Sequence, residues 1–342
     1  MAPFASEPAR AVAAATSDAG AGGGDVSVVI CTKDRPADLA GAIASIRASS
    51  DAGCGAKIVV VEESDVPRPL PGVRYVHLPR EGRGFGYARN AGVRAAGGDL
   101  ILFLDDDCEA EQGWIEGLTA PLRADRQILG VAGAVLVRDC GPIGYAENIL
   151  GFPGGGLRYL HGAGGCVVPT RLLSTCNCAY RREAVERAGG FPEDALFGGE
   201  DFLLAERISA LGPCVYAPAA VVYHRPRGRL GAVFHWFVRR GRSEMTILAR
   251  SRDRAAFARQ LLRSSWTLRV LGGVVLLARW PSLALLVPPA ILAYGAAILW
   301  RFRYARAYPT HRAGWWMVPI VKLAMDLGAE VGRWRALLGR ER

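Results

Sequence analysis

Short apolar runs alternate with amphipathic stretches through the first two thirds of the chain. Four runs of mostly β-branched or aliphatic residues predict strands, at Val26–Cys31, Ile58–Val61, Val73–His77 and Leu100–Leu104. Apolar residues at helical spacing between them predict helices, one of which carries Leu39, Ile43 and Ile46. This alternation predicts an α/β fold with a mainly parallel central sheet and helices on both faces. Sheets of this kind bind ligands beyond the carboxyl ends of their strands.

Less regular stretches follow. The glycine-rich stretch 141–165 predicts a mobile connection. Glu200–Leu211 predicts a helix that begins after Gly198-Gly199, and Val221–Tyr223 predicts a last strand. The pattern over the first two thirds of the chain therefore predicts one α/β domain.

The last third has a different pattern. Val270–Trp300 is a 31-residue apolar stretch interrupted only by Arg279, Pro281 and Pro288-Pro289. One helix of that length would be about 46 Å long, longer than a hydrocarbon core of about 30 Å. We therefore expect two shorter helices that meet near Arg279-Trp280-Pro281. The stretch Gly314–Val331 predicts an interfacial helix.

Charge separates the same two regions. The net charge is +10, but residues 225–342 hold 22 of the 42 basic residues and only 5 of the 32 acidic ones. A basic region interleaved with apolar runs favours a membrane surface over nucleic acid as a partner. We divide the chain into a disordered leader (1–24), an α/β domain (25–224), a basic helical linker (225–265), a membrane helical hairpin (266–300) and a basic, interfacial C-terminal helix (301–342).

Neither the cysteines nor the leader changes this picture. Of the eight cysteines only Cys176 and Cys178 are close, and a single C-x-C pair is poor zinc spacing. We interpret the cysteines as reduced thiols. Residues 1–24 lack a basic start followed by an apolar core, which favours a disordered leader over a signal peptide.

The strongest chemical signal is Asp105-Asp106-Asp107, directly after the strand Leu100–Leu104. Three adjacent carboxylates repel one another unless a cation or hydrogen-bond donors lie among them. Oxygen ligands favour Mg²⁺ or Mn²⁺. The alternative is an acidic loop that caps a helix near Gln112–Leu122.

A second acidic pair, Glu200-Asp201, opens a predicted helix behind two glycines. A carboxylate there could take a proton from an attacking hydroxyl, although acidic residues in a first turn often only complement the helix dipole. The glycines would let the backbone approach a ligand. His224 ends the last predicted strand, and beside the acidic cluster it becomes a candidate metal ligand.

Further candidates lie near the ends of the first two predicted strands, where a nucleotide base and ribose would bind. Cys31, Thr32 and Arg35 follow the first strand, and Glu63 follows the second. A glycine-containing loop with Arg83 leads into a helix that carries Asn90, and such glycines could cradle phosphate. The G-x-G-x-x-G spacing of dinucleotide-binding folds is absent from this loop.

Together these motifs resemble glycosyltransferase family 2, with a GT-A fold, over about residues 25–224. The matching segments, in order, are Val26–Arg35, Val59–Ser64, Gly86–Gly98, Phe103–Cys108, Arg181–Phe191 and Gly199–Leu204. Two departures are glutamate in place of aspartate after the second strand, and Thr175-Cys176-Asn177-Cys178 where the family often has Gly-Ala-Asn. The second departure bears on the acceptor side of the site.

The resemblance implies a role for each candidate residue. It implies that Asp201 is the catalytic base, supported by Glu200, and that Asp107 and His224 hold a divalent metal, Mn²⁺ or Mg²⁺. The remaining candidates bind the nucleotide sugar: Cys31, Thr32, Arg35, Glu63, Arg83, Asn90, Asp105 and Asp106.

The sequence thus predicts an inverting transfer of a sugar from a nucleotide-diphosphate sugar to a hydroxyl acceptor, lipid-linked or part of a cell-envelope glycan. Basic residues on both sides of 270–300 predict a cell-membrane protein with its catalytic domain on the cytoplasmic side. The alternatives are a nucleotidyltransferase, a non-catalytic membrane scaffold with a nucleotide-binding domain, and a soluble protein in which the apolar hairpin is buried. A nucleotidyltransferase would need a glycine-rich basic loop after the first strand, and 31–35 contains no glycine.

Overall fold

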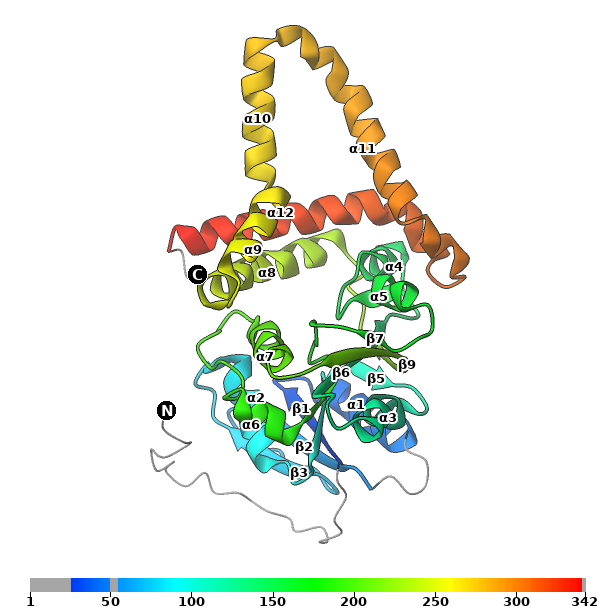
Figure 1. Cartoon of the computed structure of the whole chain (residues 1–342), viewed down its shortest axis with the longest axis vertical. Coiled ribbons are helices and arrows are strands. Elements are labelled where there is room, and N and C mark those ends of the chain that lie inside the picture. Colours follow the sequence, from blue (N-terminus) through cyan, green and yellow to red (C-terminus); the bar gives the residue numbers. More distant parts are fainter. Residues whose placement is uncertain (1–25, 50–54, 340–342) are drawn as a thin grey trace.

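A computed structural model describes residues 26–49 and 55–339, so the expected leader 1–24 lies outside the described residues. A nine-stranded sheet forms the centre of the catalytic domain, in the order β3-β2-β1-β4-β8-β6-β9-β5, with β7 paired to β9. Helices cover both of its faces, and a separate group of helices lies to one side (Figure 1). The fold class expected from the sequence is confirmed.

One half of the sheet is parallel, as expected. It consists of β1 (Val26–Thr32), β2 (Lys57–Glu63), β3 (Arg74–Leu78) and β4 (Leu100–Leu104). All five residues of β4 are buried, because helices cover it on both faces. One face packs against α1 (Pro36–Ser49) and α3 (Trp114–Ala124). The other face packs against α2 (Gly84–Ala95), α6 (Arg182–Arg187) and α7 (Glu200–Ser209).

The other half of the sheet is mixed, which the strand pattern did not predict. Its strands are β5 (Cys108–Ala110), β6 (Gly130–Leu136), β7 (Val168–Pro169), β8 (Asn177–Arg181) and β9 (Cys214–His224). Strand β8 runs antiparallel to both of its neighbours, β4 and β6. Its first residue, Asn177, therefore pairs with Leu104, the last residue of β4. This reversal brings the segment before β8 to the acidic cluster that follows β4.

The expected mobile connection at 141–165 is wrong. The stretch forms α4 (Pro142–Ile149) and α5 (Gly156–Ala163), and their apolar residues, including Ile149 and Leu157, are fully buried. Glycine content pointed to flexibility, but here glycines provide the left-handed turns between two short packed helices.

The C-terminal region is helical throughout. It contains α8 (Leu230–Arg250), α9 (Arg254–Ser264), α10 (Trp266–Arg279), α11 (Val287–Arg301) and α12 (Val318–Leu337), with three short 3₁₀ turns between them: Pro281–Leu286, Arg303–Ala307 and Arg312–Met317. Helices α10 and α11 form a hairpin that projects away from the rest of the molecule (Figure 1). The first leg ends at Arg279, and the 3₁₀ turn from Pro281 connects it to the second leg, where the sequence predicted a break.

Helix α8, in the segment 225–265 interpreted above as a basic helical linker, contacts α7 of the catalytic domain and packs against α12. At their crossing, a Cβ on Gly241 would lie 2.0 Å from the main-chain oxygen of Ala329. A Cβ on Gly332 would lie 2.0 Å from the main-chain oxygen of Val238. Only glycine permits so close an approach of two backbones. Helices α8 and α12 therefore form one rigid layer.

The hairpin is the most exposed apolar part of the described chain. Val275, Leu285 and Leu292 are 66%, 82% and 75% exposed. Pro281–Arg301 is long and apolar enough to cross a membrane and is almost entirely unburied, and α9 with α10 form a second candidate bent by 50°. A helical hairpin buried in a soluble domain, the alternative left open by the sequence, does not describe this structure.

Candidate active site

The chain brings its acidic and basic candidates together at the carboxyl ends of three strands. The acidic residues 105–107 follow β4, Thr32 ends β1, and His224 ends β9. Pairing of β5 with β9 places Cys108 opposite His224, and the amide of Arg225 donates to the Asp107 carbonyl at 2.9 Å. The main chain itself therefore holds Asp107 and His224 side by side.

Asp106 is the most buried of the three carboxylates. Its Oδ2 accepts from the Thr32 hydroxyl at 2.7 Å and its Oδ1 from Arg35 Nη1 at 3.1 Å. Burial raises the pKa of the Asp106 carboxyl, while the Thr32 hydrogen bond and the Arg35 charge oppose that rise. Both donors come from the end of β1 and the turn after it, as expected for a site at the strand ends.

Asp107 and His224 form a suitable pair of metal ligands. The Nε2 atom of His224 lies 3.3 Å from Asp107 Oδ1, while Arg35 Nη1 binds the other oxygen at 3.0 Å. Adjacent ligand atoms of an octahedral Mg²⁺ lie about 3 Å apart when each bond is about 2.1 Å, so this spacing fits. The Nδ1 atom of His224 is 2.7 Å from the Arg225 carbonyl, which assigns its proton to Nδ1 and leaves Nε2 free to coordinate.

Two thiols lie beside the same centre. Cys176, Asp105 and His224 form one compact group of possible ligand atoms, and Cys108, Asp107 and His224 form another. Burial raises the pKa of both thiols well above the usual value, which disfavours the thiolate form that a metal binds. The Cys176 thiol instead donates to Asp105 Oδ2 at 3.0 Å. The effective donor set is one of oxygen and imidazole, which suits Mg²⁺ or Mn²⁺ better than zinc.

Arg89 joins the two acidic motifs; it lies in the family-like segment Gly86–Gly98 but was not selected as a site residue. This buried side chain makes an ion pair with Glu200 and lies 3.5 Å from Asp105. Burial opposes its charge, but the two carboxylates outweigh that effect and raise the pKa of Arg89. Burial also raises the pKa of Glu200 to about 7, despite the opposing Arg89 charge. Arg89 thus fixes the start of α7 relative to the end of β4.

Asp201 is less buried than Glu200. It is half-buried, and its Oδ1 accepts from the neighbouring amide of Phe202 at 2.7 Å. Among the described residues its other oxygen makes no hydrogen bond or ion pair. Glu200, in contrast, is 3% exposed and held by Arg89.

The glycines before α7 have a different use from the one expected. Gly199 has a φ of 95°, and a Cβ there would lie 2.8 Å from the Ser243 hydroxyl and 2.9 Å from Ile247. Both contacts belong to α8, so the close approach is to a helix of the same chain rather than to a ligand.

Helix α8 also brings an arginine toward the site. The guanidinium of Arg239 lies 5.9 Å from the Phe85 ring centre, and Arg89 lies 5.5 Å from the same ring. Its partly desolvated position and the charges of Arg227 and Arg35 lower the pKa of Arg239, while Glu200 and Asp105 oppose this. Arg239 has no ion pair among the residues that the structure describes. It was not selected from the sequence, because it lies beyond the motif-bearing region.

The remaining candidates lie further from the acidic cluster, with one exception. Cys31 precedes Thr32, whose hydroxyl binds Asp106, and burial raises the pKa of the Cys31 thiol to about 12. Lys33 Nζ lies 2.6 Å from Glu63 Oε1, and this ion pair joins the ends of β1 and β2. Arg83 stacks on Tyr87 at 3.6 Å.

Asn90 is turned toward a neighbouring loop. Its amide donates to Phe191 O and Glu193 Oε1, both at 2.9 Å, and accepts from Phe191 N at 2.9 Å. The amide thus ties α2 to the segment before α7. The candidates that lie at the ends of β1, β4 and β9, in contrast, are close together in the structure.

Comparisons with known proteins point to one family. Residues 27–189 match the profile of Glycosyl transferase family 2. The chain is 28% identical over 249 residues to Pre-mycofactocin glycosyltransferase from two strains of Mycobacterium tuberculosis, an alignment that covers 68% of this chain and 49% of that protein. A shorter match, 34% over 61 residues, is to Glucosyl-dolichyl phosphate glucuronosyltransferase from Haloferax volcanii, and covers 18% of this chain and 20% of that one.

Among solved structures, the chain is similar to a mannosyltransferase from Pyrobaculum calidifontis in complex with GDP-Man and Mn²⁺. The TM-score is 0.57 at 17% identity, with 93% of this chain and 88% of that chain covered. Coverage of that extent includes helices beyond the sheet domain, so the likeness in fold extends into the C-terminal region. The chain spans about half the length of the mycobacterial relatives it matches.

Proposed function

Residues 27–189 belong to a glycosyltransferase family 2 domain, and from this premise we propose that the chain transfers a sugar, with inversion, from a nucleotide-diphosphate sugar to a hydroxyl acceptor. The observation that carries the proposal is the convergence of Asp105–Asp107, His224 and the Arg89–Glu200 pair at one edge of the sheet. These residues have the chemistry needed to bind a donor, to hold a metal and to act as the base.

The donor occupies the space beyond the ends of β1, β2 and β4. Thr32 and Arg35 orient Asp106 as an acceptor for ribose hydroxyls, and Glu63 can accept from a base N–H. Arg239 and Arg35 supply positive charge for the diphosphate, since Arg239 has no carboxylate partner among the described residues. The similar Pyrobaculum mannosyltransferase was solved in complex with GDP-Man and Mn²⁺, which supports a donor of this class.

Asp201 is the catalytic base in this proposal. Its unengaged oxygen can accept the acceptor's hydroxyl proton, which frees the oxygen to attack the anomeric carbon opposite the diphosphate. Glu200 is a positioning residue, because it is buried and held by Arg89. Asp201 then stays at the first turn of α7.

Asp107 and His224 would hold a divalent cation, Mn²⁺ or Mg²⁺. Such a cation stabilises the negative charge that develops on the departing diphosphate. Arg35 holds Asp107 Oδ2 and so keeps Oδ1 toward His224.

The hairpin supports a location at the cell membrane, with the catalytic domain in the cytoplasm. The second leg continues from the 3₁₀ turn as Pro281–Arg301, which is long enough to cross a membrane, and α9 with α10 form the second candidate span. Two spans, or a hairpin that turns back inside the bilayer, both leave the two ends of the hairpin on the same side. Basic residues flank it on both ends, as the positive-inside rule requires for cytoplasmic flanks. An acceptor that is lipid-linked, or part of an envelope glycan, suits this placement.

The test is metal-dependent binding of nucleotide to the full-length protein in detergent. We expect Mn²⁺ together with GDP or UDP to raise the unfolding temperature of the wild type, and Asp107→Ala to abolish this rise. Glu109→Ala is the matched control, since Glu109 is two residues away and pairs only with Arg138 at the surface. An unchanged rise in Asp107→Ala would refute the metal assignment, and no rise for any nucleotide in the wild type would refute the donor class.

A further inference from the structure

We propose that the chain binds one anionic phospholipid in a cavity beneath the hairpin, at a site separate from the acidic cluster. The proposal does not rest on the donor or the reaction proposed above. It rests on the charges that line this cavity, on its apolar walls and on its position relative to α8.

The cavity has two connected parts. One has a volume of about 1000 Å³ and lies between α9 and the ends of α10 and α11. The other has a volume of about 540 Å³ and extends across α12 to α8. They share the lining residues Gln260, Ser264, Arg269 and Arg301. Together they form a recess at the base of the hairpin.

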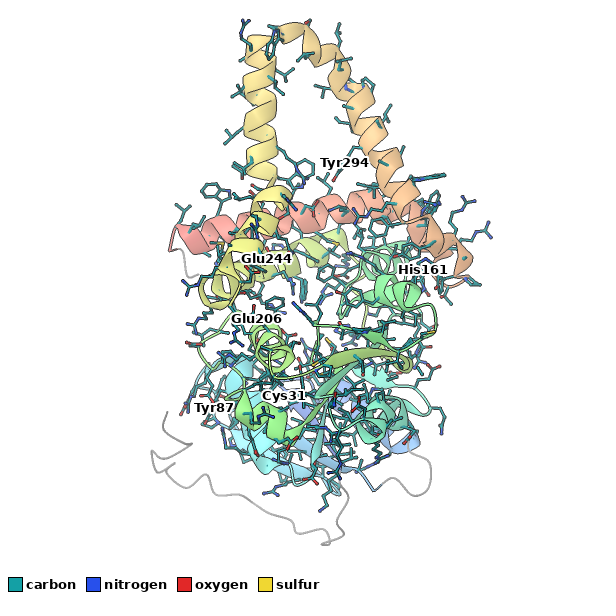
Figure 2. The ribbon with its side chains drawn as sticks, in the orientation of Figure 1. Cys31, Tyr87, His161, Glu206, Glu244 and Tyr294 are labelled. Atoms are coloured by element: carbon teal, nitrogen blue, oxygen red, sulfur yellow. The ribbon has the colours of Figure 1, made fainter. Side chains whose placement is uncertain are left out.

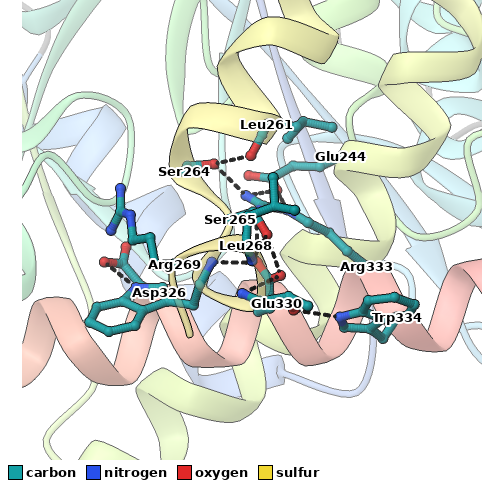
Figure 3. A network of polar contacts seen from close by, with 12 residues as sticks. Glu244, Leu261, Ser264, Ser265, Leu268, Arg269, Asp326, Glu330, Arg333 and Trp334 are labelled. Carbon is teal, nitrogen blue, oxygen red and sulfur yellow. Dashed lines mark hydrogen bonds and ion pairs between the residues drawn. The ribbon is translucent and has the colours of Figure 1, made fainter. Parts of the chain in front are cut away.

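The carboxylates that face this recess are already neutralised. Glu244 binds Arg333 at 2.7 Å (Figure 3). Asp326 binds Lys322 at 2.7 Å. Glu330 lies in the same network, where it accepts from the Ser265 hydroxyl at 2.7 Å and from amides at the start of α10. The network uses its acidic groups to anchor the hairpin on α12, and none is left to balance further arginines.

Five lining arginines have no carboxylate partner among the described residues: Arg158, Arg259, Arg263, Arg269 and Arg301. Arg269 Nη2 donates to the Arg263 main-chain carbonyl at 2.8 Å, which holds the Arg269 side chain against the end of α9. A recess that gathers this much positive charge without an internal anion is suited to a phosphate group.

The other walls are apolar and continue toward the exposed legs. Phe237, Ile298 and Met325 are buried against the smaller part of the cavity. Tyr294 lies between α10 and α11 (Figure 2), with its ring 6.3 Å from that of Trp266. An occupant with a charged head and an apolar tail therefore fits better than free phosphate. Tryptophans at the ends of the legs, Trp266 and Trp300, suit the headgroup level of a bilayer.

Helix α8 separates this recess from the catalytic residues. Phe237 and Glu244 line the recess, and their seven-residue spacing puts them on one face of the helix. Arg239 is about 200° around the helix from Phe237 and lies toward Phe85 of the catalytic domain. The lipid would therefore contact the face of α8 that lies opposite the active site.

The test is lipid binding to the full-length protein, delipidated in an uncharged detergent. Native mass spectrometry would count bound phosphatidylglycerol, with phosphatidylcholine and inorganic phosphate as the comparison probes. The variant pair Arg269→Gln with Arg301→Gln removes two charges from the cavity. The control pair, Arg254→Gln with Arg306→Gln, removes two exposed charges that do not line it.

We expect one phosphatidylglycerol per chain, not displaced by inorganic phosphate, and roughly 30-fold weaker binding in the cavity pair. The control pair should bind like the wild type. A second cavity pair, Arg259→Gln with Arg263→Gln, should weaken binding in the same direction. Equal weakening in the control, equal affinity for phosphatidylcholine, displacement by inorganic phosphate, or unchanged binding in both cavity pairs would each overturn the proposal.

Discussion

Strand β4 and helix α11 are both built almost entirely of aliphatic residues, yet their surroundings are opposite. Leu102 in β4 is fully buried between two layers of helices, whereas Leu292 in α11 is 75% exposed. Composition alone does not separate them. The difference lies in length and partners, because a five-residue run fits between layers while the hairpin leaves the packed body. One apolar segment thus stabilises the fold, and the other presents a surface that a bilayer can cover.

Removal of the hairpin should give the largest effect. We expect replacement of residues 271–293 by a Gly/Ser linker of about 10 residues to release the protein from membranes. The contacts of Trp266 and Tyr294 with the rest of the chain remain, so nucleotide binding should persist. Carbonate extraction and nucleotide-induced thermal shift are the measurements. A wild-type chain released by carbonate would show that the hairpin does not insert.

The second effect separates chemistry from anchoring. Asp201→Asn should lower turnover roughly 10²–10⁴-fold with donor binding nearly intact, because the proton acceptor is lost while the nucleotide contacts remain. Glu186→Gln, an exposed change on α6, is the control and should keep full activity. Steady-state kinetics and donor binding decide the matter. If Glu200→Gln spares donor binding and is the more damaging, the two roles must be exchanged.

A matched pair of truncations tests the comparison directly. Leu102→Ala should destabilise the fold by about 2–5 kcal/mol, because it removes buried methyl groups and leaves a cavity. Leu292→Ala removes the same atoms from an exposed site and should change the stability of the detergent-solubilised protein by less than about 0.5 kcal/mol. Thermal unfolding measures both. Similar losses would mean that α11 packs against protein rather than lipid.

The smallest effect is a pH dependence at the junction between the two regions. His311 is buried against α4, 2.9 Å from Asn148 Oδ1, and burial lowers its pKa to about 4. The unfolded chain protonates His311 near pH 6.5, so between pH 6.5 and 4 it binds more protons than the folded one. Stability should therefore fall with pH in that window, by about 2 kcal/mol at pH 5.

His311→Gln should make this pH dependence shallower by the same amount, and His235→Gln, on the exposed surface of α8, should leave it unchanged. Unfolding temperatures at pH 7 and pH 5 would show it. An identical slope in wild type and His311→Gln would assign the acid sensitivity to other groups.

Much of the catalytic half could be predicted because its signals are local. A buried apolar run followed by three aspartates identifies a strand end, and parallel strands bring such ends together. The family resemblance paired Asp107 with His224, and the β5–β9 register does place them together. Their roles in metal binding stay predictions.

Other features depend on packing that no local pattern reports. Arg89 and Asn90 are adjacent on α2, and only the helix's orientation decides which faces the site and which faces the Phe191 loop. Arg239 comes from a helix that continues well past the sheet, so nothing near the motifs pointed to it. The glycines of 141–165 indicated flexibility, yet burial of Leu157 and Ile149 outweighs their cost in entropy.

The glycine crossing between α8 and α12 has a mechanical consequence. Backbones that meet where a Cβ would lie 2.0 Å from a carbonyl oxygen leave little room to slide or pivot. Under the proposed placement at the membrane, the hairpin and the catalytic domain then move together, and the thickness of these two helices sets the height of the reaction centre above the bilayer. A lipid-linked acceptor would have to bring its hydroxyl to that height, so the length of the linker between its lipid and its sugar would become a criterion of selection.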